Sequence, residues 1–229
     1  MTSQDPARKR QDGLYVLVLF LLAGPFYLND FSSIYVTDWR WWLFIDYTSV
    51  KLFPLLVVLW MIGRGNMRAA DFGLARQPLA SFLAVFLAAA LIGTLMDQNG
   101  YGLIENLPGY PALAGAPAIT SPLWNWIDLT LGLAAVGLFE ELVFRGYMHT
   151  FLDRYLRSRT AIVVISALAF GLIHWSAGLH VVVVAACIGA VFMLAYLRTK
   201  ALPAIMLAHF AVNFVDYAGV IPKAWFKFV

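Results

Sequence analysis

The sequence places two adjacent carboxylates and an arginine inside a long apolar run, Trp124 to Leu152. These three residues are Glu140, Glu141 and Arg145. A charged side chain at the centre of a bilayer costs about 2.5 to 3.5 kcal/mol even on the mildest scale. The run therefore predicts a membrane helix whose charged side chains face a protein interior or a wet cavity rather than lipid.

The composition agrees with a polytopic membrane protein. Of the 229 residues, 62% are hydrophobic and 13% are charged, whereas soluble domains carry about 25% charged residues. The net charge of +3 does not indicate nucleic acid as a partner, because excess Lys and Arg in a membrane protein mark the cytoplasmic loops. We expect the lipid bilayer as the surroundings, and the single cysteine, Cys187, excludes an intrachain disulfide.

Seven apolar segments predict an all-α, polytopic transmembrane helical bundle of about seven helices, within a range of six to eight. The segments are Leu14 to Leu28, Thr48 to Ile62, Leu79 to Met96, Trp124 to Leu152, Ala161 to Trp175, Leu179 to Leu197 and Pro203 to Tyr217. The second, fifth and seventh are marginal, because a span needs roughly 20 apolar residues. Between them, the stretch Asp30 to Asp46 suits an interfacial segment, and the Pro- and Gly-rich loop from Gln98 to Pro122 suits an extended or re-entrant one. We expect one domain over residues 1–229, with the motif-bearing core at about 123–218.

Loop charge predicts the orientation. If the N-terminus is cytoplasmic and all seven segments cross, eleven of the sixteen Lys and Arg fall in the cytoplasmic segments. They are Arg8, Lys9, Arg10, Arg64, Arg68, Arg76, Arg154, Arg157, Arg159, Arg198 and Lys200. This distribution follows the positive-inside rule, and five tryptophans then gather on the outer face: Trp39, Trp41, Trp42, Trp124 and Trp126. With a retained first span and short loops, we expect a prokaryotic inner-membrane protein.

Polar residues in three of the segments share one depth. Glu140 lies fourteen residues before Arg154, and His174 lies fourteen residues after Thr160, which is about 21 Å along a helix in both cases. His209 and Asn213 follow Lys200 by nine and thirteen residues. These side chains are therefore expected in one layer within about two helical turns.

The residue types in this layer suit hydrolysis by an activated water. Glu141 and Arg145 are spaced i, i+4 and can pair, whereas Glu140 is rotated by about 100° and points elsewhere. Glu140 is then the candidate base, and His174 is the candidate partner for the water. His209 and Asn213 share a helix face and offer N–H donors for an oxyanion.

These motifs resemble a known family. Glu-Glu-x-x-x-Arg at Glu140 to Arg145, Phe-x-x-x-His at Phe170 and His174, and His-x-x-x-Asn at His209 and Asn213 occur in the order found in the CAAX protease and bacteriocin-processing enzyme family. This family of intramembrane proteases includes the type II CAAX prenyl endopeptidases. The motifs cover the C-terminal half of the chain, and the first 120 residues carry no signature of the family.

The resemblance implies a helical bundle with an intramembrane catalytic cavity, and an intramembrane endopeptidase acting on a protein or peptide. It implies Glu140 as the base, His174 as its partner, and His209 with Asn213 as the oxyanion site. Glu141, Arg145 and Phe170 would support the site. No obligatory cofactor is expected, although the family has been labelled metalloprotease. Zinc held by Glu140, His174 and His209 stays open, because two histidines and a glutamate can ligate zinc but the His-Glu-x-x-His spacing is absent.

Two other classes of function compete with this reading. The polar residues could form the relay of a transporter or proton-coupled channel, but no inverted repeat of the kind many transporters carry is visible. The chain could also be an inactive relative that acts as an immunity or scaffold protein.

Among the other polar residues, His149 and His180 are expected at the interface or in a loop, and Asp128 and Asp216 near helix ends. The substrate, whether a leader, a C-terminal tail or a prenylated protein, is not defined by the sequence.

Overall fold

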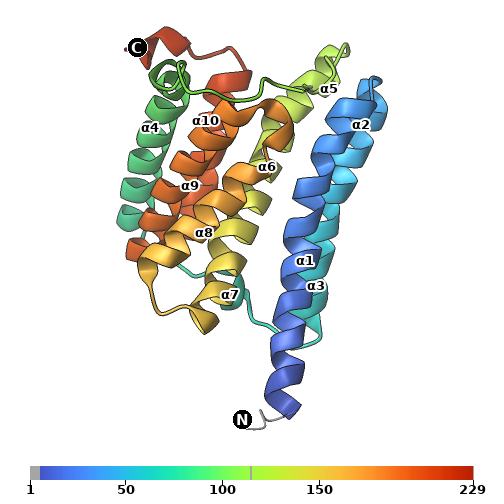
Figure 1. Ribbon diagram of the computed structural model, residues 1–229, viewed down its shortest axis with the longest axis vertical. Helices are drawn as coiled ribbons and strands as arrows, with labels where there is room; N and C mark the ends of the chain where they lie inside the picture. The colour runs from blue at the N-terminus through green and yellow to red at the C-terminus, as the bar shows by residue number, and fades with distance from the viewer. Residues whose placement is uncertain (1–5, 114, 229) are drawn as a thin grey trace.

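The protein is an all-helical bundle in which seven continuous helical rods follow one another along the chain (Figure 1). The computed structural model describes residues 6–113 and 115–228; for residues 6–10 only the backbone is described, so the side chains of the first basic cluster lie outside the description. The rods are α1 (Pro6–Tyr35), α2 to α3 (Trp39–Asp46 and Phe53–Gly63), α4 (Leu79–Leu103), α5 to α7 (Pro122–Ile127, Leu133–Glu141 and Met148–Tyr155), α8 (Arg159–Leu172), α9 (Leu179–Thr199) and α10 (Leu202–Tyr217).

Four of the rods are long and apolar enough to cross a membrane. They cover Gln11–Tyr35, Trp39–Gly63, Leu79–Leu103 and Leu179–Thr199. Helices α8 and α10 are apolar but have only 14 and 16 residues, as their marginal sequence segments predicted. The polytopic membrane bundle is therefore confirmed, whereas crossing by the other three rods stays a prediction.

Three stretches of π-helix interrupt two of the rods. One, η1 (Tyr47–Leu52), joins α2 to α3, and two others, η3 (Asp128–Gly132) and η4 (Leu142–Tyr147), join α5 to α6 and α6 to α7. A π-helical turn inserts a residue into the regular ladder and often marks a functional site. Here η4 begins directly after the glutamate pair, so it changes the direction of the side chains that follow, Arg145 among them.

The rods form two groups that face one another. In the C-terminal group, α4, α6, α8, α9 and α10 pack together, with α10 lying between α4 and α6. In the N-terminal group, α1 packs along the α2–α3 rod, and it also contacts η4 and α7 (Figure 1). The two chain ends lie at opposite ends of the bundle: α7 lies at the same end as the N-terminus, and α5 at the same end as the C-terminus (Figure 1).

A glycine brings the two central helices close together. A Cβ on Gly137 of α6 would lie 2.8 Å from the backbone oxygen of Met206 and 2.9 Å from the backbone nitrogen of Phe210, both on α10. Real Cβ atoms essentially never come this close to backbone atoms. Gly137 therefore permits the approach that places the glutamate pair beside α10.

The stretch from Asp30 to Asp46, expected as an interfacial segment, is helical over most of its length. The structure continues α1 to Tyr35 and starts α2 at Trp39, so nearly all of this stretch belongs to the two membrane-length rods. The physical reason is a local helix start, because the Asp38 side chain accepts a hydrogen bond from the Arg40 backbone N–H at 2.8 Å and caps α2. The expected extended loop begins later than Gln98, because α4 runs on to Leu103.

Candidate active site

A cavity of about 480 Å³ separates the N-terminal group from α6 and reaches the predicted site residues. Glu140, His174, His209 and Asn213 all line it. The structure therefore brings together the four residues that the depth comparison placed in one layer. Their side chains come from α6, from the turn after α8, and from α10.

Glu141 and Arg145 form a completely buried ion pair. Arg145 Nη1 lies 3.0 Å from Glu141 Oε1, and both side chains are 0% exposed. The guanidinium carbon also lies 4.0 Å from the ring centroid of Phe170 and 5.6 Å from that of Phe192. The predicted pairing of Glu141 with Arg145 is confirmed, and Phe170 supports the guanidinium through a cation–π contact.

His209 lies between the two glutamates. Its Nδ1 is 2.7 Å from Glu141 Oε1, and its Nε2 is 3.6 Å from Glu140 Oε2. A histidine that donates Nδ1–H to a carboxylate is held in one orientation. The sequence interpretation assigned His209 to an oxyanion site with Asn213, but it did not predict the bond to Glu141.

Several ionisable side chains meet around this histidine. Glu140 and Glu141 lie on its two sides, and Arg145 contacts Glu141. An imidazole can donate a hydrogen bond from both ring nitrogens only when it is doubly protonated.

His174 follows the end of α8. Its Nδ1 lies 3.2 Å from the Phe170 backbone oxygen, and its ring packs edge-on against the Phe170 ring at 5.3 Å. The predicted segment to Trp175 is thus too long, because α8 ends at Leu172. Among the described residues, no direct hydrogen bond joins His174 to Glu140, although both line the cavity. Its role as partner of the water therefore remains a prediction.

A metal site is not assembled in this part of the chain. Within residues 6–113 and 115–228, no three His, Cys, Asp or Glu side chains are grouped so that they could hold a metal ion. His209 already contacts Glu141 through Nδ1, and His174 stands apart from the glutamates. Among the described residues, Glu140, His174 and His209 are therefore not grouped as a set of zinc ligands.

The cavity has polar lining residues that sequence reasoning missed. Lys51 pairs with Asp46 in the π-helical segment η1, and Asp128 in η3 accepts a hydrogen bond from the Tyr47 hydroxyl at 3.1 Å. Asp30 of α1 accepts one from the Ser176 backbone N–H at 2.9 Å. Asp128 was expected only near a helix end. Asp46 and Lys51 are charged residues beside an apolar segment. This pattern was the sequence signal that could have predicted the polar lining of the cavity.

The other polar residues lie away from the glutamates. His149 Nε2 lies 3.0 Å from Lys200 Nζ, and Asp216 accepts a hydrogen bond from Lys223 Nζ at 2.6 Å.

A second, smaller cavity of about 70 Å³ borders Asp97 and shares His174, His209 and Asn213 with the large one. Asp97 was missed because the third apolar segment was ended at Met96.

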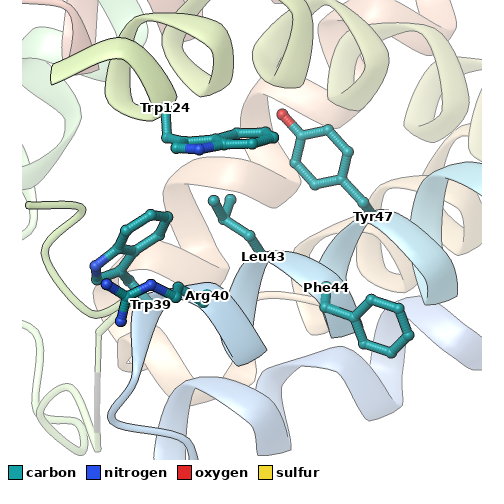
Figure 2. A pocket seen from close by; sticks show the side chains of 6 residues that line it. All are labelled: Trp39, Arg40, Leu43, Phe44, Tyr47 and Trp124. Atoms are coloured by element: carbon teal, nitrogen blue, oxygen red, sulfur yellow. The ribbon is translucent and has the colours of Figure 1, made fainter. Parts of the chain in front are cut away.

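An apolar groove lies between α2 and α5. It measures about 410 Å³ and is lined by Trp39, Arg40, Leu43, Phe44, Tyr47 and Trp124. Figure 2 shows Trp124 and Tyr47 converging above Leu43, with Trp39 beside them. Trp39 and Trp124, two of the five tryptophans expected on the outer face, line this groove together. Tyr47 of the groove donates its hydroxyl hydrogen bond to Asp128 of the cavity wall.

Comparison with known proteins identifies a domain in the C-terminal half. Residues 122–215 match the family model described as "Type II CAAX prenyl endopeptidase Rce1-like". The matched segment contains all three sequence motifs and coincides with the expected core at about 123–218. No curated protein and no solved structure matches the chain.

Proposed function

We propose that this chain is a glutamate-dependent intramembrane endopeptidase, because residues 122–215 match the model of the Rce1-like family of type II CAAX prenyl endopeptidases. Its substrate would be a protein or peptide segment that enters the cavity between α6 and the N-terminal group. Cleavage would mature a leader or a C-terminal segment. The protein would lie in a prokaryotic inner membrane, with its N-terminus in the cytoplasm.

The observation that carries this proposal is the difference between the two glutamates. Glu141 is 0% exposed and bound on both sides, by Arg145 and by His209. Glu140 lines the cavity, and its Oε2 has no hydrogen-bond partner among the described residues. A carboxylate that lines a cavity and has no hydrogen bond to one of its oxygens is suited to act as a general base.

The proposed reaction uses one water for each peptide bond. Glu140 takes a proton from the water while the water oxygen bonds to the carbonyl carbon of the substrate. The oxyanion accepts hydrogen bonds from His209 Nε2–H and the Asn213 amide, donors that stabilise the developing charge. The C–N bond then breaks, and Glu140 returns its proton to the leaving amine. The products are a new carboxylate and a new amine.

The remaining residues position these groups. His174 would hold the water against Glu140. Glu141 would fix the orientation of His209 through Nδ1, and Arg145 holds Glu141 in place by pairing with it. Phe170 packs against the Arg145 guanidinium and against the rings of both histidines, so it sets the spacing of the site.

The test is the substitution Glu140→Gln, which preserves shape and removes the base. We expect cleavage to fall by about 100-fold or more, the range of a general base. The assay follows a candidate leader or C-terminal tail, fused to a membrane anchor and reconstituted with the full chain in liposomes, by mass spectrometry of the products. Glu105→Gln is the matched control, because Glu105 is exposed in the loop after α4. Wild-type cleavage rates in Glu140→Gln would contradict the assignment.

A further inference from the structure

The cavity follows one face of the α5–α7 rod, from η3 to the end of α6. Asp128, Gly132, Val136 and Glu140 line it in succession. Twelve residues separate the first from the last, which corresponds to roughly 18 Å of helix. The catalytic carboxylate therefore lies at the inner end of a passage, and Asp128 lies near its opening.

The wide end of this passage lies at the end of the bundle that carries α5 and the C-terminus. Gly115 and Ala116, from the segment between α4 and α5, line the cavity together with Ser176 and Ala177 from the turn before α9. Figure 1 shows both connections at the end opposite the N-terminus. Ala116 is exposed, so the opening reaches the molecular surface there.

The other end of the passage is closed. Below Glu140, the side chains of Glu141, Phe144, Arg145 and Tyr147 are all 0% exposed. Phe72 also has no exposed surface and stacks on Tyr147 with ring centroids 5.6 Å apart. The backbone oxygen of Phe72 lies so close to Gly146 that a Cβ there could not fit. This packing fills the space between Glu140 and the N-terminal end of the bundle.

The closed end is the basic end. Contacts between residues distant in sequence gather the charged segments there: Arg154 Nη2 lies 3.1 Å from Asp12 Oδ1, and Gln77 Nε2 lies 2.9 Å from the Lys200 backbone oxygen. The connections at this end carry Arg64, Arg68, Arg76, Arg154, Arg157, Arg159, Arg198 and Lys200. The open end carries only Arg40, Lys223 and Lys227 outside the cavity.

We infer that the catalytic cavity opens on the non-cytoplasmic face of the membrane. Basic connections mark the cytoplasmic side, and the fold places them opposite the opening. The substrate class follows from this geometry and rests on the proposed function: a polypeptide segment exposed outside the cytoplasm, as in the outer tail of a membrane protein or an exported peptide. A substrate tail on the cytoplasmic side would instead face the closed end of the cavity.

The opening can be tested without any substrate. In the full chain with Cys187→Ser, a single cysteine is introduced at Ala116 beside the opening or at Thr160 near the basic end; both positions are exposed. Intact cells are treated with a membrane-impermeant maleimide. We expect labelling of Ala116→Cys at once, and labelling of Thr160→Cys only after permeabilisation. The opposite pattern would overturn the inference.

A second pair tests whether the passage itself is reached from that side. Val136→Cys lies on the cavity wall, and Leu138→Cys is two residues away on a helix surface that is 40% exposed and that we expect to face lipid. A small cationic methanethiosulfonate added outside intact cells should modify Val136→Cys at least about tenfold faster than Leu138→Cys, because a thiol needs water to ionise. Equal or slower modification of Val136→Cys would contradict an outer opening.

The experiments can contradict the proposed endopeptidase and the inferred outer opening independently of each other. Labelling does not require catalysis, so the same pattern is expected in the Glu140→Gln background. If that variant still cleaves while the labelling holds, the base assignment is wrong and the opening stands. If Glu140→Gln is inactive while the labelling is reversed, the protease stands and the inferred side of the substrate is wrong.

Discussion

The glutamate pair divides two roles between adjacent residues. A rotation of about 100° between neighbours on a helix sends Glu141 into the packed interior and Glu140 to the cavity. Glu141 then contacts Arg145 and His209 at once. The sequence predicted the first of these contacts from the i, i+4 spacing. The second joins residues 68 positions apart, and only the packing of α6 on α10 could reveal it.

The two glutamates should differ in their effect on stability. Glu141→Gln leaves the buried Arg145 guanidinium without its ion-pair partner, and breaking a buried pair on one side costs about 3 to 5 kcal/mol. We therefore expect a clear loss of thermal stability in detergent, together with loss of cleavage. Glu140→Gln should lose cleavage while its melting temperature stays close to that of the wild-type protein. Equal melting temperatures for both variants would show that the Arg145 pair does not support the fold.

Metal dependence is predicted from the donor set at the site. The group of Glu140, His174 and His209 is not arranged as a ligand cluster, so we expect cleavage to continue after treatment with 1,10-phenanthroline. The control is a known zinc peptidase in the same liposomes, which should lose activity. Loss of cleavage in this chain that added zinc restores would instead show that the histidines rearrange to bind the metal.

At the scale of elements, the site depends on the close contact of α6 with α10. Both helices are apolar on most faces, so sequence periodicity did not indicate which faces meet. The contact is possible because Gly137 leaves room for the backbone of Met206 and Phe210. The π-helical segment η4, which begins one residue after Glu141, then directs Arg145 back toward Glu141 and Phe170.

Gly137→Ala tests this contact. The added methyl would meet backbone atoms of α10 at under 3.0 Å, so the helices must separate and Glu140 must move away from His209. We expect cleavage to fall by about tenfold or more and the melting temperature to drop. Gly24→Ala in α1 is the control, because a methyl group there would have no neighbouring atom within 4 Å and alanine favours helix. If Gly137→Ala matched this control in activity and stability, the close approach would not position the site.

The element boundaries show where the sequence was insufficient. All seven apolar segments correspond to helical rods, because their composition excludes other membrane-spanning structures. Helix α8 nevertheless ends at Leu172, before the predicted Trp175, and α4 continues to Leu103, past the predicted Met96. These ends are set by tertiary contacts, such as the Ser176 backbone N–H to Asp30, which local residue types do not encode.

At the scale of the whole molecule, the cavity is open at one end and closed at the other. A continuous proton channel needs access from both sides in one conformation, and this packing argues against such a path through the described residues. The fully buried side chains of Phe72, Phe144, Arg145 and Tyr147 fill the space between Glu140 and the basic end.

We therefore expect no proton flux through the reconstituted chain. Liposomes that contain the protein and an internal pH-sensitive dye should hold an imposed pH gradient as long as empty liposomes do. Gramicidin added at the end of the measurement collapses the gradient and serves as the control. A protein-dependent collapse that Glu140→Gln abolishes would support the relay function instead of hydrolysis.

The sequence by itself determined the membrane class, the seven helical segments and the residue types of the site, because lipid tolerates polar groups only where the protein interior or water receives them. Matching depths along separate segments were enough to place Glu140, His174, His209 and Asn213 in one layer. Only the tertiary structure decided that His209 lies between the two glutamates, that Asp128 and Lys51 belong to the cavity wall, and that the cavity ends below Glu140. These features depend on which helix faces meet, and faces that are apolar all round carry no signal of their partners.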